Sequence, residues 1–414
     1  MSTADRSGMP GQEPAARTAG GRPDGDLSAM GDLDSSLWDA DLSLPMPVLC
    51  TPAVAVPEHI ITQAETLELA RRMHADHPQV KLVLRLIENT GVAKRHLIRP
   101  IEDTLVHTGF GHRNKVFEAE AKKRVPAVVD QALAHAGLKH ADIDAIVFVS
   151  CTGFMMPSLT AWMINELGFR NDTAQLPIAQ LGCAAGTAAI NRASDFCKAR
   201  PGANALIVAC EFCSLCYQPE DLDVGSLLSN GLFGDAVAAA VVRGDGRGTG
   251  VQLAAQTSHV VPGTDTWISY EVKETGFHFR LNKGVPGTMQ QVMPELCQFV
   301  ADQGHDLAKL DFHVIHTGGP RVLDALRSHG GVPSEALGDS WDTLSSYGNI
   351  ASAAVFDVLR RVAEKSPEES ATGIIAGFGP GITMELALGS WVIDPDDRAL
   401  AAATGAQAAG GRAL

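Results

Sequence analysis

The sequence predicts an α/β protein built from two structurally repeated halves. Strands and helices alternate between about residues 46 and 394, and the strands contain continuous Val/Ile runs typical of strands buried on both faces. Three pairs of segments resemble one another in order, at separations of 165, 166 and 167 residues. Such a regular offset indicates a duplication. We therefore expect one half at 46–250 and the other at 251–394.

The two ends of the chain differ in composition from these halves. Residues 1–45 are rich in Gly, Ala, Pro and Asp and contain eight acidic and three basic residues, without apolar periodicity. This composition predicts a disordered tail. Residues 395–414 are rich in Ala and Gly and predict a second, flexible tail. The N-terminus lacks the basic segment followed by an apolar one that marks a secretory signal.

The first half illustrates the alternation of elements. Residues 119–138 predict a helix and residues 144–152 a buried strand. A second helix is expected over 157–169, beginning at Ser158, because serine is a favoured N-cap residue. Residues 205–217 then give another apolar run, which predicts a buried strand and its continuation. This order is that of a strand–helix–strand unit.

The repeated segments pair residues that could carry chemistry. The segment "VFVSCTG" resembles "FHVIHTGG", which places Cys151 against His316. The segment "GCAAGTAAI" resembles "GNIASAAVF", which places Cys183 against Asn349. The third pair is "LIVACEF" and "GIIAGFG". Because equivalent positions of a duplicated fold meet around its pseudo-twofold axis, we expect Cys183, His316 and Asn349 to form one site.

Composition and charge exclude several functions. Hydrophobic residues make up 45% of the chain and charged residues 20%, as in ordinary globular proteins. The net charge of −15 offers no basic surface, so we expect no nucleic-acid partner. No apolar stretch is long enough to span a membrane. We therefore expect a cytoplasmic protein whose eight cysteines are thiols.

A metal site is a weak alternative for three of these cysteines. Cys210, Cys213 and Cys216 follow a C-x-x-C-x-x-C spacing. A second group of Cys or His ligands at matching spacing is missing from the sequence, and the run around these cysteines is apolar. We expect no metal.

Cys183 stands out as a nucleophile. The residues before it predict the end of a strand, and the small residues after it predict the start of a helix. The positive end of a helix dipole lowers the pKa of a thiol placed there. A neighbouring His316 would stabilise the thiolate as an ion pair, and the Asn349 amide would donate to an oxyanion.

Four of these segments also resemble a known family. "QLGCAAG", "VIHTGGP", "YGNIAS" and "GFGPGITMELALG" are similar to signature segments of the type III polyketide synthases, the chalcone/stilbene synthase superfamily. The resemblance covers about residues 47–393. It implies a duplicated, five-layered αβαβα thiolase-like fold and a homodimer that needs no cofactor, coenzyme A being a carrier on the substrate.

The resemblance also implies roles for the three site residues. Cys183 would carry the growing polyketide as a thioester. His316 and Asn349 would bind the thioester carbonyl of malonyl-coenzyme A and stabilise the enolate left by decarboxylation. Phe233 and Phe279 match the two aromatic gatekeepers between the coenzyme A tunnel and the cavity.

Further substrate-binding positions follow from the same resemblance, which places Met156 across the dimer interface in the partner's cavity. Other matching positions would shape the floor of the tunnel or bind the coenzyme A phosphates. The floor residues are Gly318, Gly319 and Pro320, and the phosphate-binding residues are Lys94 and Arg95.

The cavity residues resemble one bacterial branch of the family, whose members make 1,3,6,8-tetrahydroxynaphthalene from five malonyl units. Plant members typically have Thr where this chain has Cys151 and Cys216. Tyr270 would offer a hydroxyl to a small polar starter. These residues favour malonyl-coenzyme A as both starter and extender, although Cys151 could equally be a space-filling residue.

Other functions remain open at the level of sequence. A related polyketide synthase could use an acyl starter to make a pyrone or a resorcinol. A ketoacyl-carrier-protein synthase shares the fold and the Cys-His-Asn site. A cysteine hydrolase has a similar order of Cys, His and Asn, but the sequence around Cys183 lacks the papain-like context. A non-catalytic scaffold is a further alternative.

Overall fold

The computed structural model describes residues 45–399 except residue 107. The predicted N-terminal tail and most of the predicted C-terminal tail lie outside the described residues. Residues 395–399, which the sequence assigns to the flexible tail, instead form a helical turn. This turn is held by Arg247, which binds Asp396, and by Thr249, which donates to Asp397.

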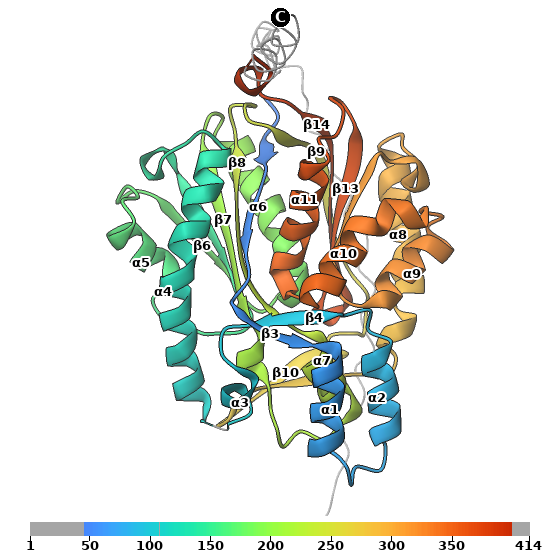
Figure 1. The fold of residues 1–414 in the computed structure, drawn as a ribbon. Helices are drawn as coiled ribbons and strands as arrows, with labels where there is room; N and C mark the ends of the chain where they lie inside the picture. Colours follow the sequence, from blue (N-terminus) through green and yellow to red (C-terminus); the bar gives the residue numbers. More distant parts are fainter. Residues whose placement is uncertain (1–44, 107, 400–414) are drawn as a thin grey trace, which may run out of the picture. The chain divides into compact units, whose positions relative to one another are not determined.

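A ten-stranded mixed sheet forms the centre of the protein (Figure 1). Its order is β12-β13-β14-β9-β1-β8-β7-β5-β6, with β2 paired to β8. The strands are β1 (Val48–Cys50), β2 (Ala53–Ala55), β5 (Ala145–Val149), β6 (Ala174–Ile178), β7 (Asn204–Phe212), β8 (Asp235–Arg243), β9 (Gly250–Val260), β12 (Phe312–Ile315), β13 (Thr372–Gly379) and β14 (Thr383–Val392).

The strand pairing confirms the duplication. In the first half β5 is parallel to β7 and β7 is antiparallel to β8. In the second half β12 is parallel to β13 and β13 is antiparallel to β14. The three pairs of similar segments lie in equivalent elements of the two halves. These pairs are β5 with β12, β7 with β13, and two 3₁₀ turns that each lead into a helix.

Helices cover both faces of each half and give the five layers (Figure 1). The central helices pack in one core cluster with strands of both halves, and the outer helices form two separate clusters. The central helices are α6 (Ala185–Ala199) and α11 (Ala354–Glu364), and the outer ones are α4 (Phe110–His135), α5 (Leu159–Glu166), α8 (Met289–Asp302), α9 (Pro320–His329) and α10 (Gly338–Tyr347). The predicted αβαβα arrangement is confirmed.

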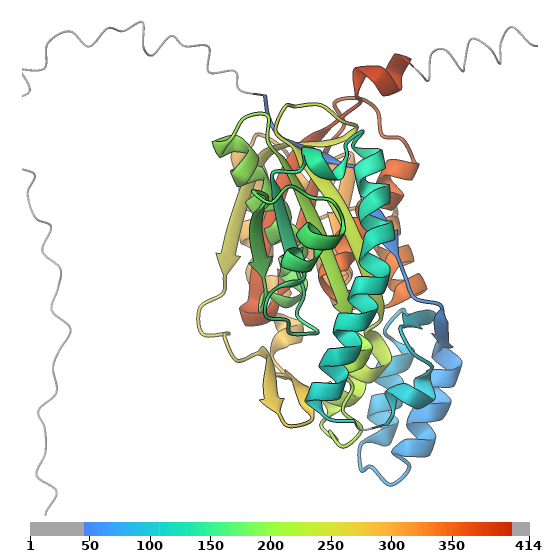
Figure 2. The same ribbon diagram turned by 90° about the vertical axis from the view of Figure 1, so that its left-hand side faces the viewer.

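Smaller elements gather beyond one end of the sheet (Figures 1 and 2). They are β3 (His59–Thr62), β4 (Lys94–Leu97), β10 (Ile268–Lys273), β11 (Gly276–Leu281), α1 (Gln63–Met73), α2 (Val80–Glu88), α3 (Ile101–Thr104) and α7 (Val224–Leu232). The β10–β11 hairpin carries Tyr270 and Phe279, two of the predicted cavity residues.

The local predictions are largely confirmed. Helix α4 and strand β5 cover most of the residues assigned to them, and β7 ends in a 3₁₀ turn at Cys213–Cys216. Ser158 is the N-cap residue of α5, but its hydroxyl makes no capping bond and is buried without a partner. Within the described residues, no helix is both long and apolar enough to cross a membrane.

Candidate active site

Cys183 lies in a tight turn between β6 and α6. The turn needs unusual backbone angles, with a φ of 64° at Gln180 and 50° at Gly182. A Cβ on Gly182 would lie 2.7 Å from the ring of Pro380, and one on Gly379 would lie 2.6 Å from the backbone N of Ala184. The small residues around Cys183 therefore let the turn pack directly against the segment that follows β13.

Asn349 directly contacts this cysteine. It follows Gly348, which ends α10 with a φ of 72°. The backbone of Ala351 donates to Asn349 Oδ1 at 2.9 Å, which orients the side-chain amide. The Asn349 Nδ2 atom then lies 3.8 Å from Cys183 Sγ. The amide N–H groups are thus available to a negatively charged oxygen beside the sulfur.

His316 lies on the same side of the sheet, directly after β12. Its backbone N donates to Ala376 O at 2.9 Å, and the neighbouring Gly377 packs against Ala184, next to Cys183. The side chain is 1% exposed, and Nδ1 is buried without a hydrogen-bond partner. In the described part of the chain no hydrogen bond joins His316 to Cys183.

The electrostatics differ from the sequence prediction for this pair. Burial and the nearby Glu211 raise the pKa of the Cys183 thiol to about 12, although the Asn349 hydrogen bond opposes this. Burial lowers the pKa of His316 to about 3. Both shifts oppose the thiolate–imidazolium pair that the sequence predicts, because burial removes water from both charged groups. They favour a neutral thiol and a neutral imidazole in the free site.

Glu211 is a site residue that the sequence analysis missed. This β7 carboxylate is fully buried and accepts from the backbone N of Cys151 at 3.1 Å, from Thr152 Oγ1 at 3.0 Å and from Ser352 Oγ at 2.5 Å. Burial raises its pKa, and these hydrogen bonds oppose the rise. The sequence contained one signal for a special role of Glu211, because it is the single charged residue within the apolar run "LIVACEF".

Cys151 joins this network. Its thiol lies 3.6 Å from Glu211 Oε2, and burial followed by the Glu211 charge raises its pKa well above the usual range for a thiol. Cys151 and Cys183 therefore both lie near the buried Glu211, whose charge raises the pKa of each thiol.

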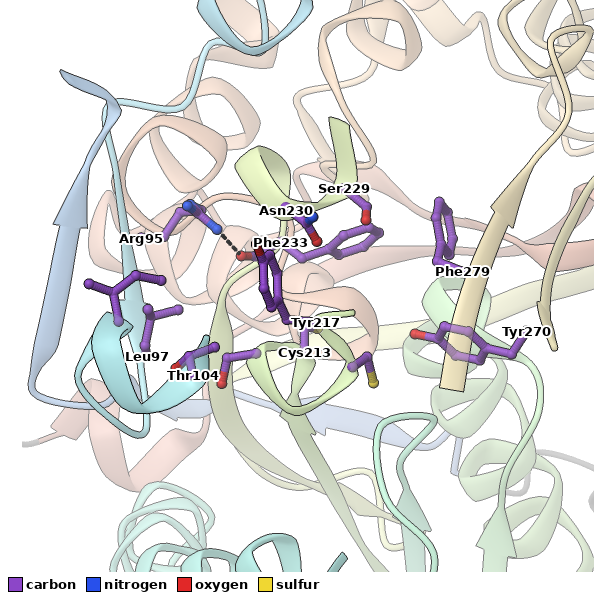
Figure 3. A pocket seen from close by; sticks show the side chains of 13 residues that line it. Arg95, Leu97, Thr104, Cys213, Tyr217, Ser229, Asn230, Phe233, Tyr270 and Phe279 are labelled. Atoms are coloured by element: carbon purple, nitrogen blue, oxygen red, sulfur yellow. Dashed lines mark hydrogen bonds between the residues drawn. The ribbon is translucent and has the colours of Figure 1, made fainter. Parts of the chain in front are cut away.

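A pocket of about 500 Å³ lies next to this site (Figure 3). Four of the predicted cavity residues line it, namely Cys216, Tyr270, Phe233 and Phe279. Phe233 connects the pocket to the site, because it forms a backbone bridge with Asn349. The remaining lining residues are Arg95, Leu97, Ile101, Thr104, Cys213, Ser214, Tyr217, Ser229 and Asn230.

The aromatic side chains of this pocket contact one another. The rings of Phe233 and Phe279 meet edge to face at 5.6 Å, and Tyr270 stacks on Phe277 at 5.3 Å. Tyr270 directs its hydroxyl into the pocket that Cys216 also lines (Figure 3). Burial, followed by the neighbouring thiols, raises the pKa of Tyr270 well above its usual value, so the hydroxyl keeps its proton.

The Arg95 side chain is buried at the wall of the pocket, where it donates to Phe233 O at 3.0 Å and to Thr66 Oγ1 at 2.9 Å. Both terminal nitrogens thus bind groups of the protein, and the phosphate-binding role of Arg95 stays a prediction. Lys94, its neighbour in β4, is exposed and remains a prediction.

The other predicted positions lie around the site. Gly318 lies close to His316, because a Cβ added at Gly318 would lie 3.2 Å from His316 Nε2. Gly319 caps α9 with a φ of 140°, and Pro320 is the first residue of that helix. The Met156 side chain is 87% exposed.

All eight cysteines are free thiols, and no group of three potential metal ligands occurs among the described residues.

Comparison with known proteins defines the family of the chain. The chalcone and stilbene synthase N-terminal domain model matches residues 46–246, and the corresponding C-terminal domain model matches residues 251–391. The chain therefore belongs to the chalcone and stilbene synthase family.

Two relatives and one solved structure show which members of the family this chain resembles. A 1,3,6,8-tetrahydroxynaphthalene synthase of Streptomyces coelicolor is 63% identical over 84% of this chain and 92% of its own length. A phloroglucinol synthase of Pseudomonas fluorescens is 45% identical over 84% of this chain and 99% of its own length. The crystal structure of the S. coelicolor tetrahydroxynaphthalene synthase, described as a bacterial type III polyketide synthase, superimposes with a TM-score of 0.82 and covers 83% of this chain and 99% of its own.

Proposed function

We propose that this chain is a type III polyketide synthase that condenses five malonyl units into 1,3,6,8-tetrahydroxynaphthalene. Malonyl-coenzyme A would serve as both starter and extender. The observation that carries the proposal is the 63% identity to a tetrahydroxynaphthalene synthase over most of both chains. The pocket supports it, because Cys216 and the Tyr270 hydroxyl make its wall polar beside the aromatic gate of Phe233 and Phe279.

The reaction would begin with acyl transfer to Cys183. The neutral His316 imidazole can accept the thiol proton as the sulfur attacks the thioester carbonyl of malonyl-coenzyme A. Coenzyme A leaves with a proton, and the acyl group remains on Cys183. This route fits the neutral resting pair, because no thiolate has to exist before substrate binds.

Decarboxylation of the next malonyl unit would use the two hydrogen-bond donors. The C–C bond to the carboxylate breaks, carbon dioxide leaves, and the electron pair forms an enolate whose charge collects on the thioester oxygen. Asn349 Nδ2 and an N–H of His316 would donate to that oxygen. The orientation of Asn349 is fixed by Ala351, so the donor is in place before the charge develops.

Carbon–carbon bond formation would be the next step of the reaction. The enolate carbon attacks the thioester carbonyl on Cys183, the bond to sulfur breaks, and the thiolate leaves and regains its proton. The lengthened chain, now on coenzyme A, returns to Cys183 for the next cycle. The pocket beside Phe233 would receive the growing chain.

The proposed enzyme is a homodimer of two copies of this chain. Phe154 and Met156 are 56% and 87% exposed, and Asn114 holds this loop by binding the backbone N of Phe154. Large exposed apolar side chains on a fixed loop support a homodimer in which Met156 reaches the partner. The eight free thiols support a cytoplasmic location.

An acyl-primed polyketide synthase making a pyrone or resorcinol is the alternative that remains within the family. A ketoacyl-carrier-protein synthase, a cysteine hydrolase and a non-catalytic scaffold fit less well, because the chain belongs to the chalcone and stilbene synthase family over both halves.

Incubation of the purified chain with malonyl-coenzyme A alone, followed by mass spectrometry, tests the proposal. We expect tetrahydroxynaphthalene or its oxidation product flaviolin, and no such product from Cys183→Ala. Cys197→Ala is the matched control, because Cys197 lies buried in α6, the helix that follows Cys183, and bonds only backbone carbonyls. Products that appear only when an acyl-coenzyme A starter is added would overturn the malonyl starter.

A further inference from the structure

Arg113 is a buried cation that the proposed reaction does not use. It lies in the first turns of α4 and is 6% exposed. Its Nη1 donates to the backbone O of Leu215 at 2.7 Å and to the backbone O of Tyr217. No carboxylate among the described residues forms an ion pair with it, and Nη2 is buried without a partner. Such a group is costly to bury, so its position calls for an explanation.

The two carbonyls that Arg113 binds flank Cys216. Cys216 and Tyr270 line the same pocket, and the Cys216 thiol donates to Thr152 O at 3.9 Å. The Arg113 charge also acts on the Cys216 thiol and favours its ionised form. Arg113 therefore fixes the backbone on both sides of a cavity residue and lies close to its side chain.

Two other residues anchor the same loop from other directions. The Asp235 carboxylate accepts from Ser214 N at 2.8 Å and from Ser214 Oγ at 2.6 Å. Gln218 Nε2 donates to Phe277 O at 3.1 Å, which ties the loop to the hairpin that carries Tyr270. Arg113 anchors the middle of this loop through two backbone carbonyls, and the Cys216 thiol adds the bond to Thr152 O at 3.9 Å.

The start of α4 also contacts the hairpin. The Phe110 backbone N donates to Glu274 O at 2.9 Å, and the Phe110 ring meets Phe277 edge to face at 5.1 Å. The helix that carries Arg113 thus touches both sides of the pair formed by Cys216 and Tyr270. Helix α4 therefore contacts both the loop that carries Cys216 and the hairpin that carries Tyr270, two segments that line the pocket.

We propose that Arg113 is a positioning residue that holds Cys216 against Tyr270 and thereby determines how long the polyketide grows before it is released. This inference rests on the proposed function. The chemistry at Cys183 is separate from it, because Arg113 contacts neither Cys183, His316 nor Asn349. Loosening the pocket wall is expected to release shorter lactones while the decarboxylation of malonyl-coenzyme A continues.

The test compares Arg113→Gln with the unaltered chain, using malonyl-coenzyme A as substrate. Two quantities are measured, the ratio of pentaketide to shorter lactones and the rate of malonyl decarboxylation. We expect the ratio to fall about tenfold, as misplaced binding groups cause, while decarboxylation stays within about threefold. Arg113→Lys keeps the charge and can still donate to a carbonyl, so it should restore much of the ratio.

Arg243→Gln is the matched control. Arg243 also donates to a backbone carbonyl, that of Ala136 at 2.8 Å, but it lies at the far end of β8 from the site. The ratio of pentaketide to shorter lactones made by Arg243→Gln should equal that of the unaltered chain. An unchanged ratio in folded Arg113→Gln overturns the proposal, and so does an equal fall in Arg243→Gln.

Two further outcomes are informative. If Arg113→Gln does not fold, Arg113→Lys carries the test. The lysine ammonium does not reproduce the position of Nη1 between the two carbonyls, so the ratio should still fall measurably below that of the unaltered chain, and an unchanged ratio overturns the proposal. If the unaltered chain makes no pentaketide, the proposed function fails. The Arg113 proposal is then judged on the ratio between the two longest products that the chain does make.

Discussion

Asn349 Nδ2 lies 3.8 Å from Cys183 Sγ, and its orientation is fixed by a hydrogen bond from Ala351 N to Asn349 Oδ1. Cys183 lies in the 3₁₀ turn that precedes α6, and Asn349 lies two residues before the corresponding turn that precedes α11. The two halves thus bring a hydrogen-bond donor beside the candidate nucleophile.

Asn349→Asp tests the donor role. The carboxylate can still accept from Ala351, but it offers no N–H to the thioester oxygen. We expect malonyl decarboxylation to fall on the order of 100-fold, the typical cost of one lost oxyanion donor. The assay is the rate of carbon dioxide release. Asn165→Asp, at an exposed position of α5, should leave the rate unchanged.

The ionisation of Cys183 can be followed by alkylation. With a thiol pKa raised to about 12, the thiolate fraction of the free enzyme should rise about tenfold for each pH unit between 7 and 9. Iodoacetamide labelling of the Cys183 peptide, measured by mass spectrometry, should follow that slope. A rate that levels off near neutral pH would mean that the thiolate–imidazolium pair does exist.

His316 should make folding stability depend on pH. Its pKa is about 3 in the folded protein and about 6.5 in the unfolded chain, so the unfolded chain binds the extra proton as pH falls below 6.5. Between pH 6.5 and 5.5 this residue should lower the free energy of unfolding by about 1 kcal/mol. Urea titrations should show this loss in the unaltered chain but not in His316→Gln. Equal losses in both would contradict the buried, neutral imidazole.

Gly379→Ala tests the packing under the nucleophile. The new Cβ would lie 2.6 Å from the backbone N of Ala184, so the Cys183 turn must move. We expect a loss of about 1–3 kcal/mol in stability together with most of the activity. Gly338→Ala is the control, since an added Cβ there meets nothing within 4 Å. Full activity in Gly379→Ala would show that the turn tolerates displacement.

The sequence was sufficient for the fold and for bringing Cys183 and Asn349 together, whereas the roles of Cys183, His316 and Asn349 stay predictions. The constant offset between similar segments predicts equivalent elements, and β5 with β12 and β7 with β13 have that relation in the structure. The helix start after Cys183 was also predictable, because the following run is rich in alanine, a strong helix former. These predictions depend on local pattern and on symmetry, both of which a single sequence contains.

The structure differs from the sequence predictions where the burial of a side chain decides its role, because the sequence does not specify which side chains are buried. Arg95 looked like a surface cation, but pairing of β3 with β4 directs it into the protein, towards Thr66. The Cys183 pKa was expected to fall with the helix dipole, yet desolvation and Glu211 dominate. Glu211 and Arg113 were missed because their roles come from partners distant in sequence.

The central claim is that malonyl-coenzyme A supplies the starter as well as the extender units. The most direct measurement gives the enzyme uniformly ¹³C-labelled malonyl-coenzyme A together with an excess of unlabelled acetyl-coenzyme A. Mass spectrometry then shows the origin of each carbon in the product. The account predicts tetrahydroxynaphthalene in which every carbon is labelled. A product that retains one unlabelled acetyl unit would contradict it.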